Sequence, residues 1–422
     1  MKAMVIARVH SGLSAGVIAG RWQPSGSPAV YRLIESLDAA GELRLVLGWK
    51  GEREGPARDS TVTLTGLRTP VTVLAGPVSL PGWLRSWRSA LGELRHVWKT
   101  WRMVRRERPN VVHVDRGNLW TAAILARWSD VPVVYRMLGM SEELCAAYGG
   151  QRPRDRINRW MLRAPFAAVV CTEDGSGGRQ WLARLLRPGV SQHHLLNGVA
   201  RSAEGDSEWL VEARRAIPSG RIVVLCAGRL EQIKGCDDFL EAFLEARAQA
   251  PGALHAVFVG AGERESALRQ RVTGARADAD VLFLGAVPHR QVHAVYRRAD
   301  VYVSLNRMGS LSNTTLEALA YGCCVVLPTS DPRTFRDLST EDILPEGTVV
   351  RFGTIDDRAK LAATLLRLAK DPASRSKVAS AGQAVAAHLL TSWDDRIAWE
   401  VSLLHDLSRT RAAPARMREV RP

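Results

Sequence analysis

The sequence of 422 residues has no uninterrupted apolar run approaching the ~18 residues that a membrane-spanning helix needs. Its moderately apolar N-terminus, residues 1–20, is interrupted by Arg8 and His10, which argues against a secretory signal peptide. The six cysteines are scattered without the spacing of metal ligands, and we expect them to be buried free thiols. Solenoid-length repeats and low-complexity blocks are also lacking. We therefore expect a globular cytoplasmic protein without a metal site or a cofactor.

Length and charge favour two domains with different partners. A chain of 422 residues exceeds what one hydrophobic core usually serves, and its apolar fraction of 46% suffices for a substantial core. The net charge of +15 is uneven, because residues 1–200 carry 28 Lys and Arg against 15 Asp and Glu while the remainder is nearly balanced. The basic front half indicates an anionic partner, which leaves a membrane surface, a lipid pyrophosphate acceptor, an acidic glycan and nucleic acid as alternatives.

Strand-like and helix-like segments alternate along both halves of the chain. This alternation predicts an α/β fold with two doubly wound, Rossmann-like parallel sheets. The polar stretch over 197–220 is expected to connect them. We therefore predict an N-terminal domain over 1–200, a C-terminal domain over 201–390, a last helix over 391–408 and a disordered basic tail over 409–422.

Residues 81–108 combine tryptophan and arginine at helical spacing. Such a helix suits a membrane interface, with its apolar face toward lipid and its cations toward anionic head groups. Alternatively, it is the long helix before the strand-like run 110–115 and packs its tryptophans on the sheet. Both hold if an inner stripe joins the core and the outer basic face meets lipid. The residues concerned include Trp83, Trp87, Trp98, Trp101, Arg88, Arg95 and Arg102.

Residues 226–235 (CAGRLEQIKG) form a strand–turn–helix pattern with two cations. A strand-like run leads into a turn at Gly228 that carries Arg229 and Lys234, and a helical pattern follows Gly235. Arginine offers a planar fork of donors and lysine a compact charge, so the pair suits a diphosphate. The alternative is two surface cations that flank a turn.

Residues 309–322 (GSLSNTTLEALAYG) suggest a second half of the same site. Asn313 is expected to cap a helix that stops at Gly322, and the polar loop before it has amides that could face an anion. Glu317 falls one turn inside, where its carboxylate can accept both hydrogens of a ribose diol. Alternatively, it is a first-turn glutamate favoured by the helix dipole. The loop and first-turn candidates are Ser310, Leu311, Ser312, Asn313 and Thr314.

In the front half, ligands are expected at the carboxyl ends of parallel strands. Arg116 and Asn118 follow one strand-like run and Arg136 ends the next. Arg116 is otherwise a solvated loop cation and Asn118 a helix cap. A glycine–serine loop before Pro28 also precedes a helix, which makes it a phosphate-facing candidate or a simple tight turn. Its candidate residues are Ser25, Gly26 and Ser27.

The segments over 226–235 and 309–322 resemble the signatures of the retaining, group-one (family four) glycosyltransferases. The resemblance implies a GT-B fold, in which two Rossmann-like domains face each other across a cleft. It also implies an acceptor-binding N-terminal domain, a nucleotide-sugar-binding C-terminal domain and a last helix that crosses back to the first domain. Further matches, in the family's order and spacing, are residues 197–199 (NGV), 259–263 (VGAGE), 281–288 (VLFLGAVP) and 296–303 (YRRADVYV).

The same resemblance assigns residue roles. Arg229 and Lys234 would act in catalysis by neutralising the charge that grows on the leaving nucleoside diphosphate. Gly260 and Gly262 would lie near the phosphates, and Val287 would touch the base through its backbone. The family transfers sugar with retention on the front face, with the leaving phosphate as base, so that neither a protein nucleophile nor a metal ion is required.

Two departures from the family affect sugar recognition. The family's first glutamate would stand at Gly309, and the histidine–glycine pair after the strand-like run 131–136 is replaced by Tyr135-Arg-Met-Leu-Gly139. The nucleotide-binding residues are retained. We therefore predict transfer of a hexose-type sugar from a nucleoside-diphosphate sugar to a lipid-linked or polysaccharide acceptor, by a cytoplasmic protein that can sit at the inner face of the cell membrane.

Three alternatives follow from the same residues. A non-catalytic relative is suggested by Gly309, and a nucleotide-sugar epimerase is a sibling on the same fold. A nucleic-acid-binding protein would explain the basic, tryptophan-rich stretch, although no nucleic-acid module is recognised. The base, the sugar, the acceptor, the linkage and the oligomeric state are left open by the sequence.

Overall fold

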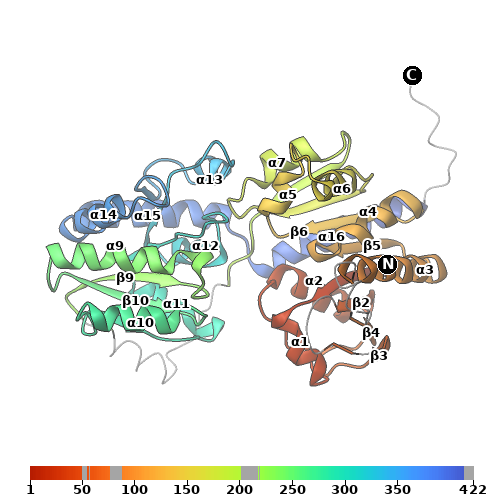
Figure 1. The fold of residues 1–422 in the computed structure, drawn as a ribbon, viewed down its shortest axis with the longest axis horizontal. Helices are drawn as coiled ribbons and strands as arrows, with labels where there is room; N and C mark the ends of the chain where they lie inside the picture. The colour runs from red at the N-terminus through yellow and green to blue at the C-terminus, as the bar shows by residue number, and fades with distance from the viewer. Residues whose placement is uncertain (50–54, 57, 77–87, 201–216, 218, 413–422) are drawn as a thin grey trace. The chain divides into compact units, whose positions relative to one another are not determined.

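The computed structural model describes residues 1–49, 55–56, 58–76, 88–200, 217 and 219–412, and it divides into two compact units (Figure 1). Unit 1 comprises Met1–Thr172, Trp181–Leu195 and the chain from Asp394 onward. Unit 2 comprises Glu173–Gln180 and Leu196–Trp393. Most of the expected connection and part of the expected basic tail lie outside the described residues, as do Trp83 and Trp87.

Unit 1 is built on a sheet with the strand order β3-β4-β2-β1-β5-β6-β7-β8. Neighbouring strands are parallel except β3 and β4. The strands are β1 (Ala3–Val9), β2 (Leu43–Trp49), β3 (Ser60–Val62), β4 (Val71–Leu74), β5 (Val111–Asp115), β6 (Val133–Met137), β7 (Ala168–Thr172) and β8 (Ser191–Leu195). The helices are α1 (Ser11–Ile18), α2 (Pro28–Ala39), α3 (Arg88–Glu107), α4 (Leu119–Trp128), α5 (Glu142–Ala146), α6 (Pro153–Leu162), α7 (Gly178–Leu185) and α16 (Trp393–Ala412).

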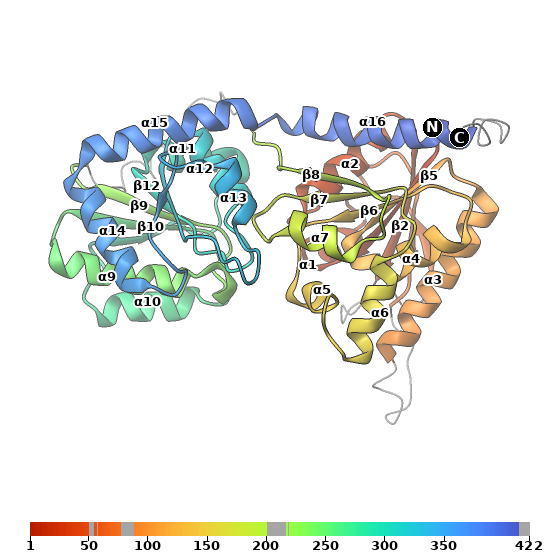
Figure 2. The ribbon, with the colours of Figure 1, turned by 90° about the horizontal axis from the view of Figure 1, so that it is seen from above.

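Helices cover both faces of this sheet (Figure 2). Side chains alternate along a strand, so the apolar run of β1 supplies both faces. Met4 and Ile6 join a core with the helices α3, α4, α6 and α7, whereas Val5 and Val9 join a second core with α2 and α16. This double coverage explains why the strands are nearly continuous apolar runs.

Unit 2 holds a parallel sheet with the order β11-β10-β9-β12-β13-β14. One face packs on α9, α10 and α14, and the other on α11, α12 and α15. The strands are β9 (Ile222–Ala227), β10 (Leu254–Val259), β11 (Val281–Phe283), β12 (Val301–Val303), β13 (Cys324–Leu327) and β14 (Val350–Arg351). The helices are α9 (Cys236–Gln249), α10 (Glu265–Gly274), α11 (His289–Arg298), α12 (Asn313–Ala320), α13 (Leu338–Ile343), α14 (Arg358–Lys370) and α15 (Pro372–Leu389).

Both sheets are doubly wound, as predicted. In unit 2 the chain adds strands outward from β9 to β11 and then restarts with β12 on the other side of β9. In unit 1 it likewise restarts with β5 on the other side of β1. Ligands of such sheets bind outside the carboxyl ends of the strands at this reversal. Ligands are therefore expected near the turns that follow β9 and β12 in unit 2 and β1 and β5 in unit 1.

The last helix is attached to unit 1 by a buried ion cluster. Glu400 on α16 accepts a hydrogen bond from Arg396 at 2.9 Å and lies 3.0 Å from the Nε2 atom of His113. Arg136 on β6 forms an ion pair with the same carboxylate at 3.3 Å. These cations lower the pKa of Glu400 to about 2, against the opposing effect of burial. The apolar side of the helix contributes Ile397 and Leu404 to the core.

Several local predictions can be compared with the structure. Helix α2 begins at Pro28 with Ser27 as its N-cap, as expected. The N-cap of α12 is Ser312, so the assignment of that cap to Asn313 was wrong. All six cysteines are free, and five of them are buried. Within the described residues, no helix is both long enough and apolar enough to cross a membrane.

Candidate active site

A pair of cations follows β9 at the strand reversal of unit 2. Arg229 stands in the turn after the strand with a side chain that is 71% exposed, and its guanidinium bonds Glu231. Lys234 ends a short 3-10 helix, η3 (Gln232–Lys234). Burial lowers the pKa of Lys234, and the charge of Arg229 lowers it further. The two positive charges therefore act on each other, and an anion bound between them would relieve that repulsion.

Glycines allow the neighbouring turn to pack against this cation turn. The Gly228 and Leu230 amides donate to the carbonyls of Val259 and Ala261 at 2.9 and 3.0 Å. A Cβ atom on Gly260 would lie 1.8 Å from the Gly228 carbonyl oxygen. On Gly262 it would lie 2.3 Å from the carbonyl oxygen of Leu230. The structure thus brings the two predicted glycines directly beside the cation turn.

The loop before Val287 joins the same edge of the sheet. Gly260 donates its amide to the Gly285 carbonyl at 2.7 Å, which connects the turns after β10 and β11. Val287 is partly buried against the apolar core on the α11–α12 face. Its backbone contact with a base remains a prediction.

The loop before α12 does not offer the anion-facing amides that the sequence predicted at Ser310 and Leu311. The Ser310 amide and hydroxyl both donate to the Asp337 carboxylate at 2.8 Å, and the side chain is fully buried. The Leu311 amide donates to the carbonyl of Asp174 at 3.0 Å. Both donors already have internal partners, so in this structure they hold the loop in place and do not face a ligand.

The first turn of α12 carries a cluster of hydroxyl groups. The Ser312 hydroxyl lies 2.8 Å from that of Thr314 and 3.1 Å from that of Thr315. Tyr302, on β12, donates to Thr314 at 2.8 Å. The Asn313 side-chain oxygen accepts from Asn197 at 2.6 Å. These polar groups surround the N-terminus of an eight-residue helix, whose first amides and dipole favour a negative ligand.

Glu317 lies in the second turn of α12 and is buried beside Tyr296 on α11. Burial and the Glu317 carboxylate raise the pKa of Tyr296 well above its ordinary value. The carboxylate therefore lies close to the side chain of Tyr296 within unit 2. Its predicted contact with a ribose stays a prediction.

The structure explains why a side chain is missing at position 309. A Cβ atom on Gly309 would lie 2.4 Å from the carbonyl oxygen of Asp174 and 2.5 Å from the amide nitrogen of Ser176. The segment that follows β7 fills the space that a glutamate would need. The same segment brings a carboxylate of its own, which sequence reasoning missed.

That carboxylate belongs to Asp174. Burial is the main cause that raises the pKa of Asp174 to about 7, although the Ser176 amide and hydroxyl donate to its Oδ1 atom. The negative charge of Asp174 acts on Lys234 and partly offsets the lowering of the Lys234 pKa by burial and by Arg229. Neighbouring Glu173 accepts from Ser339 at 2.7 Å, and burial raises its pKa too. The position of Asp174 directly after a strand-like run was the signal that could have found it.

In unit 1, the predicted serine loop lies at the end of β1. The Ser25 amide donates to the Gly12 carbonyl at 2.7 Å, and Gly26 has a φ of 101° that favours glycine. The Gly12 amide donates to the Nδ1 atom of His10 at 3.1 Å. Tyr31 bonds the other ring nitrogen of this histidine. The serine loop therefore adjoins His10, which the sequence did not single out as a ligand.

The neighbouring strand β5 places Arg116 and Asn118 at the same strand reversal. Asn118 is buried and donates to Asp115 at 2.7 Å, and the same carboxylate accepts from the Arg8 amide at 2.7 Å. The carbonyl of Arg116 accepts from Tyr135 at 3.2 Å. Asn118 thus fixes the turn after β5, while the Arg116 side chain stays partly exposed there.

Arg136 is not at this edge. Its side chain is fully buried, pairs with Glu400 and donates to the Thr172 hydroxyl at 2.9 Å. The prediction that Arg136 lines an acceptor or phosphate site is therefore corrected, because the guanidinium serves the ion cluster that holds α16. From the sequence alone, a charged residue at a strand end suggested a ligand, since its partner lies 264 positions away.

Comparisons with known proteins agree with these features. Residues 208–385 match the family described as glycosyl transferases group 1, and residues 26–176 match the glycosyl transferase 4-like domain. The chain is 30% identical over 321 residues to a 2-deoxystreptamine N-acetyl-D-glucosaminyltransferase of Streptomyces fradiae, covering 69% of this chain and 72% of that protein. It is 29% identical over 247 residues to the lipopolysaccharide core biosynthesis mannosyltransferase LpcC of Rhizobium leguminosarum bv. viciae, covering 57% and 62%.

Solved structures show the same fold at lower identity. Sucrose-phosphate synthase from Thermosynechococcus elongatus has a TM-score of 0.70 at 18% identity, over 97% of this chain and 100% of that chain. Anabaena HepE in complex with UDP has a TM-score of 0.65 at 14% identity, over 96% and 100%. The predicted GT-B architecture is confirmed. The chain belongs to the group-one (family four) glycosyltransferases, and it is a glycosyltransferase with two Rossmann-like domains.

Proposed function

We propose that this enzyme transfers a hexose-type sugar from a nucleoside-diphosphate sugar, with retention of configuration and without a metal ion, to a lipid-linked or polysaccharide acceptor. The observation that carries the proposal is the Arg229–Lys234 pair at the strand reversal of unit 2, where burial and the charge of Arg229 lower the pKa of Lys234. UDP or a UDP-sugar is bound in two structural relatives, Anabaena HepE and a trehalose-6-phosphate protein of Escherichia coli. Binding of a nucleoside-diphosphate sugar is therefore supported by the paired cations and by the ligands of these structural relatives.

The proposed mechanism assigns one task to each group. Arg229 and Lys234 stabilise the charge that grows on the leaving diphosphate, which lowers the barrier more than it strengthens ground-state binding. The hydroxyl and amide groups at the start of α12 orient the phosphates, and Glu317 holds the ribose. The leaving phosphate takes the acceptor proton on the face from which it departs, so no protein nucleophile is needed.

Asp174 is our candidate for the carboxylate that the family places near the transferred sugar and that this chain lacks at position 309. Family members place a carboxylate at the position of Gly309, and here the segment after β7 occupies that space and contributes Asp174 instead. We infer that Asp174 contacts the transferred sugar. In unit 1, the turn with His10, the serine loop 25–27 and Arg116 would receive the acceptor. A peripheral position at the inner face of the cell membrane suits a lipid-linked acceptor.

Calorimetry with UDP, GDP and ADP tests the donor site. Replacing Lys234 by alanine removes a charge-assisted contact that is worth about 1.5–3 kcal/mol, so the affinity for the preferred diphosphate should fall by about 10- to 150-fold. Lys377→Ala, on the exposed side of α15, is the matched control and should bind as the native protein does. Equal affinity of native and Lys234→Ala proteins would remove this site from the proposal.

A further inference from the structure

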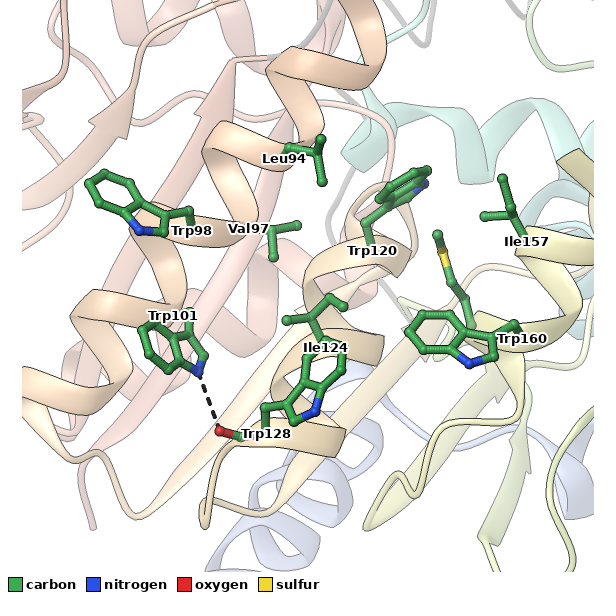
Figure 3. Close-up of a pocket in the computed structure, with 10 residues that line it drawn as sticks. Leu94, Val97, Trp98, Trp101, Trp120, Ile124, Trp128, Ile157 and Trp160 are labelled. Carbon is green, nitrogen blue, oxygen red and sulfur yellow. Dashed lines mark hydrogen bonds between the residues drawn. The ribbon is translucent and has the colours of Figure 1, made fainter.

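Three helices of unit 1 enclose an apolar hollow of about 640 Å³ (Figure 3). Helix α3 contributes Trp98 and Trp101, α4 contributes Trp120 and Trp128, and α6 contributes Trp160. The remaining lining side chains are aliphatic or methionine. A hydrogen bond joins α3 to α4 beside the hollow: the Trp101 indole donates to the backbone carbonyl of Trp128 at 3.3 Å.

Trp98, Trp128 and Trp160 lie outside the apolar core, whereas Trp101 and Trp120 pack partly against it. The buried side chains of α3 include His96, Val97, Thr100 and Val104. By contrast, Trp98 is 52% exposed, Trp128 58% and Trp160 46%. Leaving several large aromatic side chains together in water is costly for a soluble monomer and marks a surface that meets an apolar partner. The sequence left open whether the tryptophans of residues 81–108 pack on the sheet or face a membrane. Packing on the sheet does not account for Trp98, because half of its side chain is exposed.

Cations border the hollow. The guanidinium of Arg102 stacks 4.7 Å from the centre of the Trp98 ring, that of Arg105 stacks 4.7 Å from Trp101, and that of Arg127 stacks 4.0 Å from Trp160. Such stacking holds each charge at the rim of an apolar surface.

A second hollow of about 760 Å³ lies next to the first and shares Trp98 and Trp101 with it. This second hollow is lined by Arg102, Arg105 and Arg106. Within the part of the chain that the structure describes, none of the three forms an ion pair with a carboxylate. Arg95 and Lys99 differ, because each forms an ion pair with the single carboxylate of Asp59. The face thus joins an apolar recess to three arginines that form no ion pair with any described residue, although the charge of Arg106 acts on neighbouring Glu107.

We propose that this face of unit 1 docks on an anionic phospholipid bilayer, with acyl chains entering the tryptophan hollow and lipid phosphates meeting Arg102, Arg105 and Arg106. Tryptophan and arginine are both suited to this boundary, since each combines an apolar body with a polar end. The charge complementarity selects an anionic lipid, in line with the surplus of 13 positive charges in residues 1–200. The proposal goes beyond the transfer reaction and does not depend on the donor site.

Flotation of the full-length protein with vesicles tests this docking. The protein should float with vesicles of phosphatidylcholine and phosphatidylglycerol, remain in solution with phosphatidylcholine alone, and be released by high salt. The triple variant Arg102→Gln, Arg105→Gln, Arg106→Gln should lower partitioning on the order of 100-fold. Neutralising Arg264, Arg269 and Arg271 in unit 2 changes the net charge equally and should have little effect.

The hollow itself is tested by acyl-chain contact. Tryptophan emission of the native protein should be quenched by phosphatidylcholine brominated in its acyl chains, presented together with phosphatidylglycerol. Trp128→Glu should abolish flotation, whereas Ile18→Glu, an equally exposed residue of α1, should not. Quenching of the native protein decides the matter even if Trp128→Glu fails to fold.

Two outcomes would overturn the proposal as a whole, and a third would overturn its electrostatic part. One is native protein that neither floats with anionic vesicles nor is quenched by brominated chains. The other is unchanged flotation of Trp128→Glu combined with a loss of dimers in light scattering, which would make this face an interface between two copies of the chain. Binding of the native protein to vesicles of phosphatidylcholine alone, equal to binding with phosphatidylglycerol, would contradict the role of the arginines.

Discussion

Just after β7, the partly buried carboxyl group of Asp174 is close enough to Lys234 for its charge to affect the pKa of that lysine. Burial favours the protonated acid, while the nearby ammonium favours the carboxylate. A bound donor would change this balance, because its diphosphate would neutralise Lys234 and its sugar would offer hydroxyl groups to Asp174. If the proposed donor binds here, the protonation of Asp174 would be coupled to its binding.

Asp174 should make stability depend on pH. Its pKa is about 7 in the folded protein against an ordinary value of 3.8, so the folded state holds a proton between those values that the unfolded chain has lost. This contribution to stability is complete below pH 3.8 and is lost as the pH rises through 7, with a slope of at most ~1.4 kcal/mol per pH unit. Urea titrations at several pH values should show a flatter decline for Asp174→Asn. An identical decline in both proteins would contradict the assigned protonation.

Restoring the family's glutamate at position 309 should harm this enzyme. The side chain of Gly309→Glu would collide with the backbone of Asp174 and Ser176, which cannot yield without moving the segment after β7. We expect a loss of about 1–3 kcal/mol in stability and a loss of transfer activity. Gly274→Glu, at a glycine with open space around it, is the control. An active and stable Gly309→Glu protein would show that the segment moves aside.

At the scale of elements, the last helix depends on one carboxylate. Glu400 on α16 faces the buried cations Arg136 and Arg396 and the ring of His113. Removing its charge would leave two guanidinium groups buried without a counter-ion. Such half-broken clusters are strongly destabilising, because the charges have already lost their water.

We expect Glu400→Gln to cost about 3–5 kcal/mol of stability at neutral pH. The lowered pKa means that the native carboxylate contributes stability above its ordinary value of 4.5, and that this is lost as the pH falls toward about 2. The cost of the substitution should therefore shrink in acid. Asp406→Asn, in an exposed ion pair on the same helix, should cost under about 1 kcal/mol. A small effect of Glu400→Gln at neutral pH would show that the apolar contacts of α16 suffice.

The sequence predicted elements better than it predicted contacts. The run 110–115 became β5 and the helix near 314–321 became α12, because apolar period and glycine stops are local signals. The cap of α12 was misplaced by one residue, since Ser312 and Asn313 suit the position equally well. Gly309 against Asp174 and Arg136 against Glu400 join residues more than a hundred positions apart. Local patterns do not encode such pairs.

For the molecule as a whole, each unit has its own sheet and its own pair of apolar cores. Stability is therefore expected to divide between them, as in other proteins whose domains carry separate cores. The proposed donor site, with Arg229 and Lys234, lies in unit 2, and the Glu400 cluster lies in unit 1. A nucleoside diphosphate should accordingly change the unfolding of unit 2, and the substitution Glu400→Gln should change the unfolding of unit 1.

Scanning calorimetry should resolve two transitions. A nucleoside diphosphate at 100 times its dissociation constant adds about 2.7 kcal/mol to the state that binds it, so it should raise only the transition of unit 2. Glu400→Gln should lower only the transition of unit 1. At the same ligand concentration, the 10- to 150-fold weaker binding expected of Lys234→Ala should reduce this stabilisation to about 0.3–1.4 kcal/mol. Neither transition of the free protein should move by more than a few degrees. A single transition that moves as a whole with both ligand and Glu400→Gln would mean that the two cores unfold as one cooperative body, and that the donor site reports on the stability of the entire chain.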